Sequence, residues 1–267
     1  MRRIFAALVV AIFGWTHAAL AQQSGAWFTT WTSSNQQAAR PPADSVDRVP
    51  TYVNRTLRQI VRTSIGGNQV RVRLSNEYGD RPLVIGAAHL ALRDSGASIV
   101  ASTDREVLFG GRPSVTIRPG ATIVSDPVSF TVPALRDLAI TIFLPDSSRV
   151  ATRHALGLQS NYVSRPGNFA STAALPTDTT VAMWFFLSGV DVKNTAATGV
   201  IATIGNSITD GARSTPNTNR RWPDILAERL LKSKEPPKGV ANAGISGNRV
   251  LTFGTGPSAL ARLDRDV

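Results

Sequence analysis

A serine and a glycine in the last quarter of the chain stand where an acyl-transfer reaction could be carried out. Ser207 lies in the turn Gly-Asn-Ser-Ile-Thr-Asp-Gly at residues 205–211, directly after the apolar run 200–204. A serine hydroxyl can attack a carbonyl when a base takes its proton, and the oxyanion that forms needs N–H donors. The backbone N–H groups of Ser207 and of Gly247, in a second Gly-rich turn, are candidate donors.

A strand–helix–strand unit is predicted to position both turns. Residues 200–204, rich in Val and Ile and bounded by glycines, are typical of a strand that is buried on both faces. Residues 222–231 repeat apolar side chains every four positions, which predicts a helix. Residues 239–243 form the second predicted strand, and a further helix is expected to begin at about Ser258, with Leu260, Leu263 and Val267 on one face. The two strands would be parallel, and both turns would leave the same edge of the sheet.

The chain before this unit indicates β structure. Polar and apolar residues alternate at 69–75. Further strand candidates lie at 83–92, 115–117, 127–132, 138–144 and 181–188. Many short strands separated by turn residues, with no helical period, predict a β-sandwich or jelly-roll-like domain over residues 22–195. Small polar residues at 191–199 indicate a linker between two domains. An α/β domain is therefore expected over residues 196–267.

Composition excludes several classes of protein. The formal net charge is +11, but the arginines are scattered without a basic tract, so nucleic acid is not expected as a partner. The sequence contains no cysteine, which rules out disulfides and thiolate chemistry. His89 lies in an apolar strand and His154 in a loop-like region rich in Gly, Ser and Asn. No further metal ligands stand at a recognisable spacing, so no metal or cofactor is expected.

The first 21 residues have the features of a signal peptide. Arg2 and Arg3 precede an apolar run that reaches Trp15, and Ala19 to Ala21 offers small residues for cleavage. Thr16 and His17 interrupt the run too early for a membrane anchor. We therefore expect a secreted or periplasmic protein without stable membrane insertion.

Two segments resemble a known family. Residues 205–211 are similar to the first conserved block of the SGNH (GDSL-type) hydrolases, and Asn-Ala-Gly-Ile-Ser-Gly-Asn at 242–248 is similar to the second. Segments 221–224 and 256–266 also resemble secreted members that carry an N-terminal β domain. The resemblance in conserved blocks covers only residues 200–267. It implies an α/β fold of the doubly wound, flavodoxin-like type and the hydrolysis of a small-molecule or carbohydrate ester.

The resemblance also implies roles for single residues. Ser207 matches the nucleophile and supplies one oxyanion donor, and Gly247 matches a second donor. Asn206 stands where the family usually has Asp, which leaves the nucleophile in place but alters how the turn is braced. Asp210 matches a position that ties the turn and takes no part in the chemistry.

The general base of the family has no counterpart in this sequence. The third block, with an Asn donor, and the final Asp-x-x-His would both lie beyond Val267, and no His follows Ser207. We therefore expect an incomplete SGNH domain and a chain that is nearly inactive. His154 would be an alternative base, but no carboxylate stands at a recognisable position to orient it.

A second function remains open from the sequence. Trp27, Phe28 and Trp31 lie near the start of the mature chain in a Thr- and Ser-rich setting. They form either a first strand with buried aromatics or a stacking platform for a sugar. The platform would make the β domain a non-catalytic module that binds carbohydrate or another surface.

Overall fold

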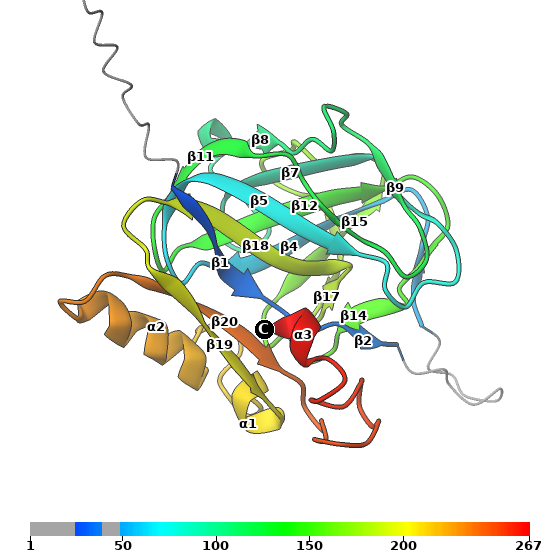
Figure 1. Cartoon of the computed structure of the whole chain (residues 1–267). Coiled ribbons are helices and arrows are strands. Elements are labelled where there is room, and N and C mark those ends of the chain that lie inside the picture. The colour runs from blue at the N-terminus through cyan, green and yellow to red at the C-terminus, as the bar shows by residue number, and fades with distance from the viewer. Residues whose placement is uncertain (1–24, 39–48) are drawn as a thin grey trace, which may run out of the picture.

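The computed structural model describes residues 25–38 and 49–267. The expected signal peptide, residues 1–21, lies outside the described residues. Strands dominate the described chain and its helices are few (Figure 1), so the prediction of mostly β structure is confirmed. Among the described residues, no helix is both long and apolar enough to cross a bilayer.

Two antiparallel sheets form the β-rich part, residues 25–194, and pack face to face (Figure 1). The first sheet has the order β1-β18-β5-β10, with β11 also paired to β5, and the second has the order β16-β15-β4-β12-β7-β8. The strands of the first sheet are β1 (Ala26–Thr32), β5 (Gly67–Ser75), β10 (Thr122–Val124), β11 (Val128–Val132) and β18 (Leu187–Asn194). Those of the second are β4 (Arg55–Arg62), β7 (Ala87–Leu92), β8 (Arg105–Glu106), β12 (Asp137–Leu144), β15 (Asn161–Pro166) and β16 (Thr177–Val181).

Short strands close the ends of these sheets, in the pairs β13-β3 and β6-β9 and the triplet β17-β14-β2. They are β2 (Gln36–Gln37), β3 (Thr51–Tyr52), β6 (Leu83–Ile85), β9 (Val115–Ile117), β13 (Ser148–Arg149), β14 (Thr152–His154) and β17 (Trp184–Phe185), with the 3-10 turn η1 (Ala101–Thr103). His154 is therefore a strand residue, and the prediction of a loop at this position is wrong. Its strand lies between β2 and β17, which supply hydrogen bonds on both sides.

The core lies between the two sheets and follows the alternation predicted for β5. Val70, Val72 and Leu74 are buried, while Arg71 and Arg73 lie on the opposite, half-buried face. Removing each such apolar side chain from water stabilises the folded protein by about 1.5–3 kcal/mol. This burial fixes the register of β5, because a slip by one residue would place the arginines in the core.

Three strand boundaries differ from the predictions. The strand expected at 83–92 is split at Gly86 into β6 and β7, which pair with β9 and β12 respectively. The strand expected at 181–188 is broken into the end of β16, the short β17 and the start of β18, which begins at Leu187 after Phe186 with a positive φ of 59°. β18 then continues to Asn194 through the expected linker, since it pairs with both β1 and β5.

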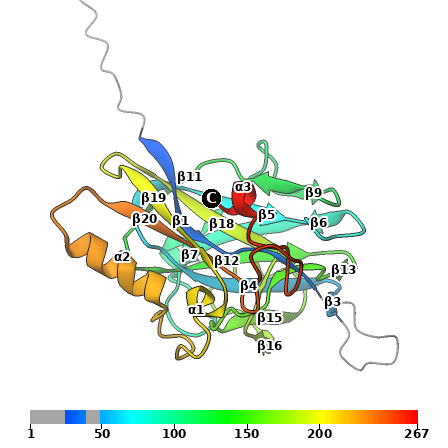
Figure 2. The same ribbon diagram turned by 60° about the horizontal axis from the view of Figure 1, so that its bottom comes forward.

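The C-terminal segment, residues 199–267, adds a parallel strand pair and the helices. Its elements are β19 (Gly199–Gly205), α1 (Ser207–Asp210), α2 (Trp222–Lys232), β20 (Lys238–Gly244) and α3 (Leu263–Asp266). β19 and β20 pair in parallel from Gly199↔Lys238 to Gly205↔Gly244, as predicted. β20 lies between α2 and β1 (Figure 2). The backbone of β20 rests on the β-rich part, where Val240 N donates to Ser64 Oγ over 2.9 Å.

Two expectations for this segment are wrong. β19 is not buried on both faces: Val200 is exposed and only Thr203 is fully buried, because β20 is its only strand partner among the described residues. The helix expected from Ser258 is reduced to turns followed by the four residues of α3. Large apolar side chains are exposed along this segment, among them Val250, Leu251, Phe253 and Leu260.

Candidate active site

The Ser207 turn follows directly from the end of β19. Asn206 is the N-cap of α1, and its Oδ1 accepts from Ile208 N over 3.2 Å. Ser207 is the first helical residue and is half-buried. Gly211 ends the helix with φ of 99°, and its N–H donates to Ser207 O over 3.0 Å. The chain thus forms a tight strand–turn–helix corner with Ser207 at its apex.

The second turn lies against the first because the paired strands end level with each other. Ile245 N continues the ladder and donates to Gly205 O over 3.0 Å. A Cβ on Gly244 would stand 2.3 Å from Asp210 N, so this close approach requires glycine. Asn242 Nδ2 also donates to Thr209 O over 2.9 Å. The two predicted site turns are therefore in direct contact.

Ser207 and Gly247 each offer a free backbone N–H. Gly247 is exposed and has φ of 78°, which few non-glycine residues adopt. Neither N–H donates to another residue of the described chain, and no described side chain bonds the Ser207 hydroxyl. Two donors and one hydroxyl at neighbouring turns can serve a substrate carbonyl, which is the arrangement that acyl transfer needs.

Asp210 joins the Ser207 turn to two other parts of the molecule. Its Oδ2 accepts from Ser246 N in the second turn over 2.6 Å. Its Oδ1 lies 2.9 Å from Nε2 of His154 in β14, and both side chains are almost fully buried. The structure thus places Asp210, expected as a brace, between the second turn and the β-rich part.

His154 has a carboxylate partner, contrary to what its sequence surroundings indicated. Its Nδ1 lies 2.8 Å from Ser34 O, and a carbonyl oxygen only accepts, so Nδ1 carries a proton. Nε2 faces Asp210 Oδ1 at 2.9 Å. Both ring nitrogens are therefore engaged and neither contacts Ser207. His154 and Asp210 are 56 residues apart in the sequence and lie on different elements, so no sequence pattern indicated that they would pair.

The other described histidine is remote from these turns. His89 Nδ1 pairs with Asp104 Oδ2 over 2.9 Å, on β7 beside the edge strand β8 of the second sheet. Within residues 25–38 and 49–267, no group of three or more His, Asp or Glu side chains is placed to hold a metal ion.

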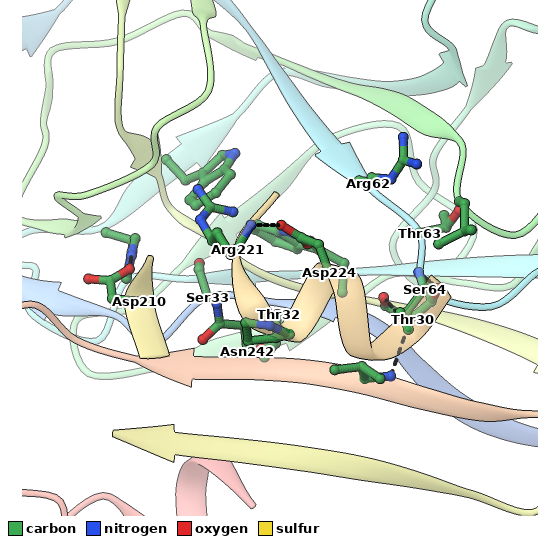
Figure 3. A pocket seen from close by; sticks show the side chains of 17 residues that line it. Thr30, Thr32, Ser33, Arg62, Thr63, Ser64, Asp210, Arg221, Asp224 and Asn242 are labelled. Atoms are coloured by element: carbon green, nitrogen blue, oxygen red, sulfur yellow. Dashed lines mark hydrogen bonds and ion pairs between the residues drawn. The ribbon is translucent and has the colours of Figure 1, made fainter. Parts of the chain in front are cut away.

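A small cavity with polar and apolar walls lies behind the Ser207 turn, between the β-rich part and α2 (Figure 3). Its volume of about 30 Å³ is enough for one or two waters. Asp210, His154, Arg221 and Asp224 line it, whereas Ser207 does not. The cavity is therefore part of the support behind the turn and does not form a substrate pocket for the hydroxyl.

Two charged residues of this cavity have altered pKa values. Burial lowers the pKa of Arg221, whose guanidinium stacks 5.3 Å from the centre of the Trp184 ring and donates to Gly157 O. Burial raises the pKa of Asp224, although Arg221 opposes the shift. Asp224 Oδ2 accepts from Arg221 N over 3.0 Å and so caps the start of α2. This pair fixes α2 against the β-rich part.

The aromatic residues of β1 do not form a flat exposed surface. Trp31 is buried and packs edge-on against Trp184, with ring centres 5.0 Å apart. The Arg71 guanidinium lies 4.0 Å over the centre of the Trp27 ring. The strand interpretation of these residues is correct, and the stacking platform is not favoured.

Comparisons with known proteins give one family and a set of weak structural likenesses. Two structures of a family two carbohydrate esterase from Clostridium thermocellum, one of an active-site mutant and one in complex with cellohexaose, are each 11% identical with a TM-score of 0.23. The matches cover 91% of this chain and 54% and 55% of those chains, so it spans about half their length. No curated protein matches the chain. Residues 201–267, which carry both turns, match the family model of the GDSL-like lipases and acylhydrolases.

Proposed function

We propose that this protein is a serine acyl-ester hydrolase of the SGNH type, with Ser207 as nucleophile. Ser207 Oγ would attack an ester carbonyl, and the N–H groups of Ser207 and Gly247 would stabilise the oxyanion. Loss of the alcohol leaves an acyl-enzyme, which water then hydrolyses. The observation that carries the proposal is the free Ser207 at the corner of β19 and α1, beside the open N–H of Gly247. The family match of residues 201–267 supports it.

The reaction lacks a base among the described contacts of Ser207. Both nitrogens of His154 are engaged, and His89 pairs with Asp104 in the second sheet. In a serine protease, removal of the base lowers turnover on the order of a million-fold. We infer that these 267 residues alone hydrolyse esters very slowly, with Ser207 as a nucleophile whose base is missing.

Added imidazole tests this proposal on the chain as it stands. Imidazole can take the place of the absent base, so it should accelerate acetylation of Ser207 by p-nitrophenyl acetate. Release of p-nitrophenol is measured over a range of imidazole concentrations, and the Ser207→Ala variant gives the background of imidazole itself. Mass spectrometry of a quenched sample should find one acetyl group on the peptide that contains Ser207.

Two results would contradict the proposal. Equal imidazole-dependent rates in the wild type and in Ser207→Ala would show that the hydroxyl takes no part. A rate without imidazole that far exceeds that of Ser207→Ala would show that a base is already present, and His154→Ala would then identify whether it is His154.

The proposal extends to the organisation of the protein. Residues 22–195 would form a β-sandwich domain and residues 196–267 the N-terminal part of an SGNH α/β domain. The largely uncovered β19, with Val200 exposed, supports the second assignment, because parallel sheets are normally covered on both faces. The first 21 residues would direct the protein out of the cytoplasm, where it would act on a small-molecule or carbohydrate ester. Amino-terminal sequencing of the protein from its host would test export, with a first residue near Gln22 expected.

A further inference from the structure

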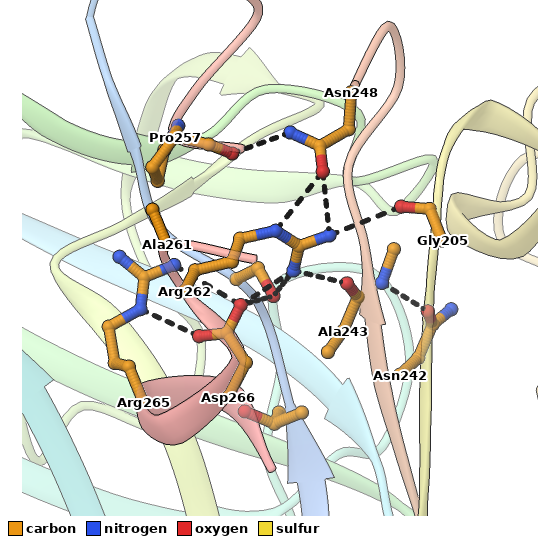
Figure 4. A network of polar contacts seen from close by, with 12 residues as sticks. Gly205, Asn242, Ala243, Asn248, Pro257, Ala261, Arg262, Arg265 and Asp266 are labelled. Carbon is orange, nitrogen blue, oxygen red and sulfur yellow. Dashed lines mark hydrogen bonds and ion pairs between the residues drawn. The ribbon is translucent and has the colours of Figure 1, made fainter. Parts of the chain in front are cut away.

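Arg262 is a fully buried arginine at the start of α3, and its guanidinium contacts both site turns (Figure 4). Nη2 donates to Gly205 O over 3.2 Å and to Asn248 Oδ1 over 3.0 Å. Nε donates to the same Asn248 oxygen over 3.2 Å, and Nη1 to Ala243 O over 2.6 Å. Gly205 is two residues before Ser207, and Asn248 is the residue after Gly247. One side chain therefore bridges the two loops that carry the free N–H groups.

The same guanidinium is anchored to the β-rich part through Ser34. Nη1 lies 3.1 Å from Ser34 Oγ and 2.6 Å from Asp266 Oδ2, and Ser34 Oγ donates to that carboxylate over 2.7 Å. The carbonyl of Ser34 is the acceptor for His154 Nδ1. Ser34 lies between β1 and β2 and supports the site in two ways. Through His154 and Asp210 it holds the first turn, and through Arg262 it holds both turns.

The charges and acceptors around the Arg262 guanidinium favour a stable contact with the two turns. The Asp266 carboxylate balances the buried charge of Arg262, and the other acceptors are carbonyl, amide or hydroxyl oxygens. A guanidinium presents five N–H groups in a rigid plane, so it can hold several acceptors at fixed spacing. A lysine ammonium has three donors on a flexible stem and cannot bridge Gly205, Asn248 and Ser34 together.

We propose that Arg262 is a positioning residue that sets the distance between the N–H groups of Ser207 and Gly247. It does so by tying Gly205 to Asn248, and Ser34 fixes this unit on the β-rich part. The β-rich part is then a structural component of the site, and not a separate module. The consequence for catalysis rests on the proposed function, but the bridge itself does not.

Hydrogen exchange tests the bridge without reference to activity. In Arg262→Lys, the amide of Ile245, which donates to Gly205 O, should exchange faster, together with the peptide that covers 245–249. Amides of β5 and β12 should keep their wild-type exchange. Arg265→Ala is the matched control: Arg265 also bonds Asp266 but is partly exposed and contacts neither turn. Unchanged exchange at Ile245 in folded Arg262→Lys would overturn the proposal.

Imidazole-assisted acetylation tests the consequence. In Arg262→Lys, the maximal acetylation rate should fall on the order of 10²-fold, the effect of a misplacement of about 1 Å, while the substrate concentration for half-maximal rate changes little. Arg265→Ala should react as the wild type does. A fall confined to substrate affinity would contradict a positioning role.

A second variant covers the case in which Arg262→Lys does not fold. Asn248→Ala releases the second turn from the guanidinium but leaves Ser34 and Asp266 in place to satisfy Arg262. It should show the same faster exchange at Ile245 and the same loss of acetylation rate, and wild-type behaviour of this variant would refute the bridge. If the wild type itself shows no Ser207-dependent acetylation, the proposed function fails, and the exchange experiment still decides on the bridge.

Discussion

The imidazole of His154 in β14 and the carboxylate of Asp210 in α1 lie 2.9 Å apart, Nε2 to Oδ1, and connect the β-rich part to the Ser207 turn. Both groups are almost fully buried, and each has a second partner: Ser34 O for the imidazole and Ser246 N for the carboxylate. The turn that carries the candidate nucleophile is thus held from both sides. A broken contact here should lower the stability of the whole molecule.

His154→Ala should reduce the free energy of unfolding by about 3–5 kcal/mol, because it leaves the Asp210 carboxylate buried without its partner. Urea unfolding followed by tryptophan fluorescence measures this change. His89→Ala is the control, since its pair with Asp104 is partly exposed, and removal of that hydrogen bond should cost only about 1 kcal/mol. An equal decrease in the free energy of unfolding of the two variants would show that the contact with Asp210 stabilises the protein no more than an ordinary hydrogen bond does.

Gly244→Ala should destabilise the contact between the two turns. The added methyl would stand 2.3 Å from Asp210 N and 2.7 Å from Asp210 Cα, which are backbone atoms that cannot move independently. Overpacking of this kind costs about 1–3 kcal/mol or more. In Gly199→Ala, at the opposite end of the strand pair, the methyl meets open space and the φ is ordinary. Thermal unfolding should show a lower Tm for Gly244→Ala alone, and a normal Tm for both variants would contradict this account of Gly244.

The sequence predicted the local elements of the site well, because they depend on near neighbours. The periodicity at 222–231 and the glycines that end two short apolar runs were sufficient for α2, β19, β20 and their parallel pairing. The pairing then placed the turns of Ser207 and Gly247 at one edge without further information.

Long-range polar contacts could not be predicted in the same way. The partners of Asp210 and Arg262 depend on how the β-rich part meets the C-terminal segment, which no local pattern encodes. Ser34 is 228 residues from Arg262 along the chain. The burial of β19 was misjudged for a related reason, since an apolar run does not reveal how many neighbours its strand has.

Asp224 should make the protein less stable as the pH rises above the ordinary Asp range. Burial raises its pKa in the folded state above 3.8, so the folded protein binds a proton more tightly than the unfolded chain does. The free energy of unfolding therefore falls as the pH increases from about 3.8 through the folded pKa. Urea midpoints measured across this range should decline less in Asp224→Asn, which keeps an acceptor for Arg221 N. Glu235→Gln, at an exposed position just after this helix, is the control and should follow the wild type.

Asp266 should have the opposite effect on the pH dependence of stability: it makes the protein less stable as the pH falls. Its burial alone would raise the pKa, but hydrogen bonds from Arg265 and Arg262 outweigh burial and hold the pKa below 3.8. A carboxylate with a depressed folded pKa contributes stability that is present above the unfolded value and is lost as the pH falls through the folded one.

The bridge at Arg262 should therefore weaken as the pH falls through the folded pKa of Asp266, which lies below 3.8, because the protonated carboxyl no longer balances the buried guanidinium. Exchange of the Ile245 amide, corrected for the intrinsic pH dependence, should rise in this range in the wild type. In Asp266→Asn the exchange should already be fast at neutral pH and change little on acidification. Asp264→Asn, an exposed neighbour on α3, should behave as the wild type. An Ile245 amide that stays protected in Asp266→Asn at neutral pH would show that Arg262 holds the two turns without its counter-charge.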